Sequence, residues 1–412
     1  MTRLTLATRV FTPFALGYFL SYLFRTVNAV IAPDLARAVV LDAAALGLMT
    51  SAYFLTFAAA QLPLGILLDR LGPRRVESAL LLIAALGALT FSRAESATGL
   101  IAGRALIGFG VSACLMAAFK ANVQWFPRER LALVNGLMMA SGGLGALAAT
   151  APVEAALRLT DWRGVFAILA LATLGVAATL FLVVPEHHDK PIAQPLSRQV
   201  RDLGRIFKSR VFWRVAPFST LSQSTFLSIQ GLWLGPWLRD VAGLDRAHAA
   251  NHLFFAAAAM VAGFVLIGAL AERLGRLGVS SNTVAAVGMV IFLGLQVAMA
   301  AGWAGSTMAL MVAFGFFGVA STLNYANLTQ AFPPDLSGRV NTALNLLIFI
   351  GAFASQAMMG AIVDVWPRDG GAYPPAAYGA AFGLFALLQA IGLAWYLWAG
   401  RLPRKEDQEQ HP

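Results

Sequence analysis

Gly65-Ile-Leu-Leu-Asp-Arg-Leu-Gly-Pro-Arg-Arg75 is the stretch that decides how this chain folds. It ends one apolar run, and a second apolar run begins directly after it at Val76. One acid, a glycine, a proline and three arginines therefore stand between two apolar segments. The pattern predicts two membrane helices joined by a tight, charged turn that faces water. Gly65 and Gly72 would allow close backbone approach and a positive φ.

A second copy of the stretch occurs in the other half of the chain. Gly268-Ala-Leu-Ala-Glu-Arg-Leu-Gly-Arg276 repeats it 203 residues later, with glutamate in place of aspartate. Phe126-Pro127 and Phe332-Pro333 form another repeated pair, 206 residues apart. Because the chain has 412 residues, two motifs at nearly the same offset predict a duplicated chain with two parallel halves, a pattern found in transporters.

The composition is that of an integral membrane protein. Hydrophobic residues make up 58% of the chain, charged residues 12%, and the mean hydropathy is +0.71. A soluble domain could not cover its surface with so few charges. The net charge of +10 comes from arginines at the ends of apolar runs, so we assign it to membrane topology and not to nucleic acid.

Twelve apolar runs are long enough to span a bilayer, so we predict an all-α fold with twelve transmembrane helices. The first half has Phe11–Pro33, Leu46–Leu68, Val76–Phe91, Thr98–Trp125, Leu131–Ala156 and Val165–Val184. The second half has Phe212–Trp237, His248–Ala271, Thr283–Ala301, Thr307–Ala331, Val340–Val363 and Ala377–Ala399. The first run is too long for a cleaved signal peptide and has no small-residue cleavage site.

The distribution of Lys and Arg predicts the topology. With both termini inside, the inner segments carry roughly three times as many Lys and Arg as the outer loops, as the positive-inside rule requires. We therefore expect a six-helix bundle over 1–184, a cytoplasmic linker over 185–211, a second bundle over 212–400 and a cytoplasmic tail over 401–412.

The linker contains a basic helical pattern. Arg198, Arg201, Arg205 and Lys208 recur at spacings of three and four, which places the cations on one helical face. A solvated linker and a helix lying on anionic headgroups both fit this pattern. His187 and His188 are adjacent and lack a third ligand nearby, so we predict no metal site.

The loop stretch and its repeat resemble the G-x-L-x-D-R-x-G-x-R-R signature of the major facilitator superfamily, and the resemblance covers the whole chain. A positively charged membrane anchor would also fit the stretch alone. The resemblance implies two six-helix bundles in pseudo-twofold arrangement, with a central cavity lined by spans 1, 4, 7 and 10. It also implies that the two loops stabilise one end-state of a rocking motion, through Gly65, Asp69, Arg70, Gly72, Arg74, Arg75, Glu272 and Arg273.

Two arginines stand inside spans, where a charge is costly and marks a functional site. Arg25 in span 1 and Arg104 in span 4 are expected at comparable depth. A guanidinium cannot lose its proton in a protein, so a bound carboxylate is an economical partner. For each arginine a structural role is the alternative, and Lys120 should extend to the headgroups.

Tyr22-Leu-Phe-Arg-Thr-Val-Asn-Ala-Val-Ile-Ala-Pro33 resembles the first-span pattern of the anion:cation symporter family, whose members move organic anions. In that family the arginine contacts the substrate carboxylate and a neighbouring aspartate takes part in proton coupling. Phe24 replaces that aspartate here. The candidate substrate contacts are Arg25, Tyr22, Asn28, Arg104, Gln223, Gln230, Asn324 and Asn327; some polar members could instead bond helix to helix.

We therefore expect a secondary active or facilitative transporter of a small solute, an organic anion, in a bacterial inner membrane. Export of drugs or siderophore-like compounds is an alternative, and so is a membrane receptor that kept the fold. No P-loop, nucleophile elbow or metal-ligand spacing occurs, so we expect no enzyme, no catalytic residue and no cofactor. The expected partners are the substrate and the bilayer, with no nucleic acid, and the protein should work as a monomer.

The sequence offers no obvious proton carrier. Glu154 and Asp364 lie close to the outer ends of their spans, and His252 lies near the outer start of span 8. Proton coupling needs a group that changes charge within reach of the cavity. The sequence therefore predicts uniport or exchange of anions.

Overall fold

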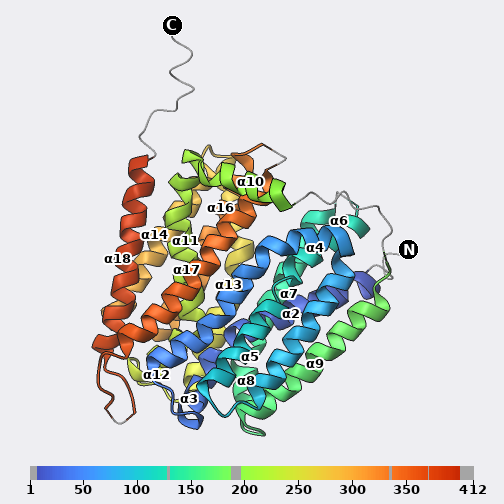
Figure 1. Ribbon diagram of the computed structural model, residues 1–412. Coiled ribbons are helices and arrows are strands. Elements are labelled where there is room, and N and C mark those ends of the chain that lie inside the picture. The colour runs from blue at the N-terminus through green and yellow to red at the C-terminus, as the bar shows by residue number, and fades with distance from the viewer. Residues whose placement is uncertain (1–6, 128–129, 187–195, 334–335, 370, 400–412) are drawn as a thin grey trace.

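The computed structural model describes residues 7–127, 130–186, 196–333, 336–369 and 371–399. These residues form helices and connecting turns, without a strand among them; Asp369 and Ala372 make one isolated bridge. Figure 1 shows the helices packed side by side as the two bundles of an all-α membrane fold. His187, His188 and the tail 401–412 lie outside the described residues.

The N-terminal half contains the first six expected spans, several of them in two pieces. Its helices are η1 (Ala7–Phe11), α2 (Thr12–Thr26), α3 (Asn28–Ala38), α4 (Ala43–Ser92), α5 (Ala97–Gly110), α6 (Cys114–Trp125), α7 (Leu131–Ala148), α8 (Ala151–Ala156) and α9 (Trp162–Val183). The helix predicted in the linker is present as α10 (Leu196–Phe207). An ion pair between Asp202 and Arg339 joins α10 to the second half.

The C-terminal half repeats this arrangement. Its helices are α11 (Arg210–Ser228), η3 (Ile229–Trp233), α12 (Leu234–Asp240), α13 (Arg246–Gly275), α14 (Ser281–Ala300), α15 (Thr307–Gly318), η4 (Ala320–Thr322), α16 (Leu323–Gln330), α17 (Ser337–Val363) and α18 (Pro375–Ala399). In Figure 1, α6 and α10 lie at one end of the molecule, and α3, α8 and α12 at the other. We call these the α10 end and the α3 end.

Ten helical segments among the described residues are long and apolar enough to cross a membrane, and the bent pair around Val27 makes an eleventh. The expected seventh span, now α11, η3 and α12, is not among them. It is helical throughout but rich in Ser, Thr and Gln, and most of these side chains are buried against other helices. Its membrane crossing is thus stabilised by protein contacts more than by lipid.

The turn predicted at Gly72 is present. Spans 2 and 3 form one continuous element, α4, which is broken only at Gly72, where φ is +78° and ψ is 159°. Side chains with a Cβ are strained in that region of φ and ψ. The glycine therefore lets the chain reverse within the loop stretch.

The four spans that the resemblance places around the cavity are all interrupted near their middle. Span 1 breaks at Val27 with a bend of 50°. Span 4 breaks at residues 111–113, span 7 passes through the π-helix η3, and span 10 passes through the 3-10 helix η4. Such breaks free backbone groups and allow bending where side chains, and not lipid, surround the helix.

Candidate substrate site

Arg25 lies between the two halves, two residues before the break in span 1. Its side chain is buried, with 8% of the residue exposed. The guanidinium carbon lies 4.5 Å from the ring centroid of Tyr22, 5.5 Å from that of Phe57 and 5.4 Å from that of Phe349. Within the described part of the chain no carboxylate pairs with Arg25, and its enclosed Nε has no hydrogen-bond acceptor.

Aromatic rings from both halves form the walls around this cation. Phe57 of α4 stacks on Phe349 of α17, with ring centroids 4.2 Å apart. Tyr22 meets Tyr18 edge to face at 5.2 Å. Gly231 of η3 packs against span 1, where an added Cβ would lie 3.4 Å from the carbonyl oxygen of Arg25. The faces of the rings attract the cation but cannot neutralise it, so the site favours an anion.

Arg104 lies in different surroundings. It is fully buried, and its guanidinium carbon lies 5.3 Å and 5.7 Å from the ring centroids of Phe91 and Phe166. Its Nη1 donates to the carbonyl oxygen of Phe24 at 2.6 Å, while Nε and Nη2 lack partners. In this conformation Arg104 therefore supports the backbone beside Arg25 from inside the first half and does not open to a shared cavity.

The polar candidates of spans 7 and 10 bond mainly to each other. Gln223 accepts from Ser321 at 2.5 Å, and Asn324 donates to Ser219 at 2.5 Å. Asn327 donates to Asn324 at 3.2 Å, and the amide of Gln230 lies 3.2 Å from the sulfur of Met260. The contacts of Gln223, Gln230 and Asn324 with Ser321, Met260 and Ser219 join helices within the second half, the alternative role that the sequence left open. Asn327 and Asn324 lie on the same helix.

Asn28 donates to Thr50 at 2.9 Å, and its buried Oδ1 has no partner. A polar chain outside the set of candidate substrate contacts crosses between the halves. Asn345 donates to Gln61 at 3.3 Å and accepts from Tyr325 at 2.9 Å. Two amides on facing helices give no signal in a single sequence, because amides also occur where helices merely pack.

The loop residues are tied within the first half. Asp69 pairs with Lys120 at 2.5 Å, so Lys120 does not extend to the headgroups as predicted. The Nε of Arg74 donates to the carbonyl oxygen of Phe181 at 3.0 Å, and Arg75 pairs with Glu186.

In the second loop Glu272 pairs with Arg276 on its own helix at 2.6 Å. Gly65 is exposed on α4 near the loop, and the described contacts give no side-chain bond to Arg70 or Arg273. Among the described residues, therefore, the two loops do not bond to each other.

At the α3 end, polar bonds hold the two halves together. Arg246 of α13 donates to both oxygens of Asp34 at 3.0 and 2.6 Å and also pairs with Glu154. The amide of Ala43 donates to Tyr373 at 3.1 Å, and Arg368 donates to the carbonyl of Leu41 at 3.0 Å. We call the contact of Arg246 with Asp34 and Glu154 the Arg246 lock.

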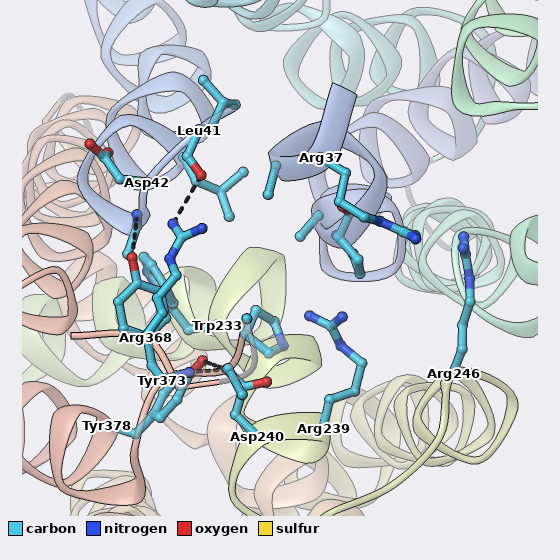
Figure 2. Close-up of a pocket in the computed structure, with 18 residues that line it drawn as sticks. Arg37, Leu41, Asp42, Trp233, Arg239, Asp240, Arg246, Arg368, Tyr373 and Tyr378 are labelled. Atoms are coloured by element: carbon cyan, nitrogen blue, oxygen red, sulfur yellow. Dashed lines mark hydrogen bonds between the residues drawn. The ribbon is translucent and has the colours of Figure 1, made fainter. Parts of the chain in front are cut away.

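A pocket of about 550 Å³ opens beside the lock, lined by α3, α12 and the starts of α4 and α18. Figure 2 shows Arg37, Arg239 and Arg368 around it, with Asp240 held by Tyr373 and Tyr378. Burial lowers the pKa of Arg239, whose nearest acid is the neighbouring Asp240. Four arginines and two aspartates line this pocket. Unlike Arg25, Arg37 and Arg246 each pair with an acid.

One buried acid is not recognisable as buried from the sequence. Glu77 is fully buried, and neither carboxyl oxygen has a hydrogen-bond partner in the described part of the chain. It follows the loop arginines by two residues, where an acid is expected to face water. Only the packing of three helices around it shows otherwise.

The described residues form a helical membrane protein with two like halves, with broken spans at their interface and an unpaired cation between them. Such a protein is a carrier and not an enzyme. The chain belongs to the Major Facilitator Superfamily, whose model matches residues 14–356.

Named relatives are transporters. A probable sulfoacetate transporter, SauU of Cupriavidus necator, is 27% identical over 293 residues, 68% of each chain. The hexuronate transporter of Escherichia coli K12 is 24% identical over 86% of this chain and 79% of its own. Among solved structures, a bacterial homologue of the human lysosomal transporter Spinster, inward-facing and unoccupied, matches with a TM-score of 0.76 and 19% identity over 97% and 98% of the two chains.

Proposed function

We propose that this protein carries a small organic anion across the bacterial plasma membrane by alternating access, and that Arg25 binds the anionic group. The supporting observation is the guanidinium of Arg25, which is enclosed between the halves and has no acidic partner among the described residues. A carboxylate or sulfonate could accept two of its hydrogen bonds. Sulfoacetate and hexuronates, named for two relatives, are small anions of this kind.

The charge of Arg25, which the surrounding rings do not neutralise, supports the choice of an anion over a cation. A cationic solute would meet the uncompensated charge of Arg25 in a low-dielectric setting, where repulsion is strong. We further infer that both termini are cytoplasmic, that the α10 end faces the cytoplasm, and that the protein works as a monomer without nucleic acid. The bundle limits 1–184 and 212–400 are part of the same proposal.

The test is binding followed by transport. Purified protein is screened by thermal shift against carboxylates and sulfonates, including sulfoacetate and a hexuronate, with cationic drugs as a second panel. Anions that stabilise the protein are then used in counterflow assays in proteoliposomes. Because charge-assisted hydrogen bonds contribute about 1.5–3 kcal/mol, Arg25→Ala should weaken anion binding by roughly 10- to 100-fold.

Arg37→Ala is the matched control. Its side chain is 75% exposed and pairs with Asp34 on the same helix, so its loss should leave anion binding unchanged. Arg25→Lys keeps the charge without the planar fork and should give an intermediate affinity. Stabilisation by cationic drugs alone, or full anion transport by Arg25→Ala, would contradict the proposal.

A further inference from the structure

Glu77 lies where three helices of the first half meet. It is carried by α4 and packs against Gly17 of α2, where an added Cβ would lie 2.2 Å from its Oε1. The thiol of Cys114, the first residue of α6, faces it from the third helix. Gly17 therefore lets the carboxyl lie directly against the backbone of α2.

Among the residues that the structure describes, no counter-charge contacts this carboxyl. Glu77 and Cys114 are both fully buried, and neither oxygen of Glu77 has a hydrogen-bond partner of proper geometry. Cys114 is the titratable group that faces it, and a thiol is only a weak donor. Burying an ionised carboxylate without donors is far more costly than burying a neutral acid.

α2 links Glu77 to the candidate substrate site. Gly17 contacts Glu77, the next residue Tyr18 packs on Tyr22, and the ring of Tyr22 lies 4.5 Å from the guanidinium carbon of Arg25. On the other side, Glu77 is only three residues from Arg74, about 4.5 Å of helical rise, and Arg74 lies in the exposed part of the loop. A small movement of α2 against α4 would therefore expose the carboxyl to water at the α10 end.

We propose that Glu77 is a proton-binding site that couples proton movement to anion transport. It takes up a proton while the α3 end is open, carries it in the present conformation, and releases it to water at the α10 end when α2 moves. This inference rests on the proposed anion transport and replaces the uniport or exchange predicted from the sequence. Cys114 is the polar side chain that faces the neutral acid.

The first experiment needs no substrate. Infrared difference spectra of the reconstituted protein are recorded over a pH series. We expect the carbonyl stretching band of a buried carboxylic acid in the wild type and its loss in Glu77→Gln, which keeps shape and polarity. Glu95→Gln removes an exposed acid after the same helix and should keep the band. An unchanged band in Glu77→Gln would overturn the proposal.

The second experiment measures coupling, with sulfoacetate and a hexuronate as probes. Under an imposed proton gradient, the wild type and Glu95→Gln should accumulate the probe, whereas Glu77→Gln should reach only the equilibrium level. Counterflow, which needs no net proton movement, should stay within about twofold of wild type in Glu77→Gln. Accumulation by Glu77→Gln equal to that of the wild type would also overturn the proposal.

The two proposals fail in different ways. If neither probe moves in counterflow through the wild type, the anion assignment fails for these probes, while the infrared band still decides whether Glu77 holds a proton. Glu77→Asp keeps an acid at the position and should keep a shifted band and gradient-driven accumulation. If Glu77→Gln does not reconstitute, Glu77→Asp decides whether Glu77 binds a proton. Loss of both the infrared band and the gradient-driven accumulation in Glu77→Asp would contradict a proton site.

Discussion

At the scale of single residues, two buried arginines show how surroundings determine a role. Arg25 is enclosed by rings from both halves, whereas Arg104 donates to the Phe24 carbonyl inside one half. In the proposed function, only Arg25 meets a solute that enters between the halves. The bond from Arg104 also fixes the backbone one residue before Arg25, so Arg104 acts on the site through position.

Tyr22 gives a prediction at this scale. Its ring is the nearest to the Arg25 guanidinium, and a desolvated cation–π contact contributes up to about 2 kcal/mol. Tyr22→Ala should let the guanidinium change position and weaken anion binding by about 3- to 30-fold. Tyr22→Phe keeps the ring and should bind as the wild type does. Titration of the stabilising anion by thermal shift measures both, and equal affinity in all three proteins would show that the ring does not position Arg25.

At the scale of elements, the reversal inside α4 depends on one glycine. Gly72 has φ +78°, where a residue with a Cβ pays about 1–3 kcal/mol. Gly72→Ala should lower the midpoint of thermal unfolding in detergent at a fixed heating rate. Gly175→Ala is the control, because Gly175 is exposed within α9 and an added Cβ meets nothing within 4 Å. A Gly72→Ala midpoint no lower than that of Gly175→Ala would show that the loop tolerates another conformation.

The sequence predicts the membrane-spanning helices and the turns between them well, because long apolar runs bounded by arginines are found in few other structures. Gly72 and the repeat at Gly275 could be found in the same way. Glu77 could not, since it stands beside the arginines of a water-facing loop. Phe57 and Phe349 could not either, because a phenylalanine facing lipid and one facing a cation look alike in sequence. The buried position of Glu77 and the contact of Phe57 and Phe349 with a cation are seen only when helices far apart in the chain are packed together.

At the scale of the whole molecule, most of the described bonds between the halves lie at one end, and the bond from Asn345 to Gln61 lies away from it. The Arg246 lock and the bonds of Ala43 and Arg368 join them at the α3 end. At the α10 end the ties of Asp69 and Arg74 stay within the first half, and Arg75 pairs with Glu186 at the start of the linker. Alternating access requires the bonded end to open, so the lock must break in each transport cycle.

Arg246→Gln should therefore shift the population toward a conformation open at the α3 end. Its side chain is only 34% exposed and faces two acids, so its loss should remove roughly 1–3 kcal/mol of preference for the closed end, a factor of about 5 to 150 in population. Spin labels at Val40 and Val365, both highly exposed and in different halves, would report a longer distance. Arg37→Gln removes a cation that also pairs with Asp34 but on the same helix, so it should leave the distance distribution unchanged. If the two variants give the same distribution, the interaction with Asp34 and Glu154 is not what keeps the α3 end closed, and the bonds of Ala43 and Arg368 must hold it instead.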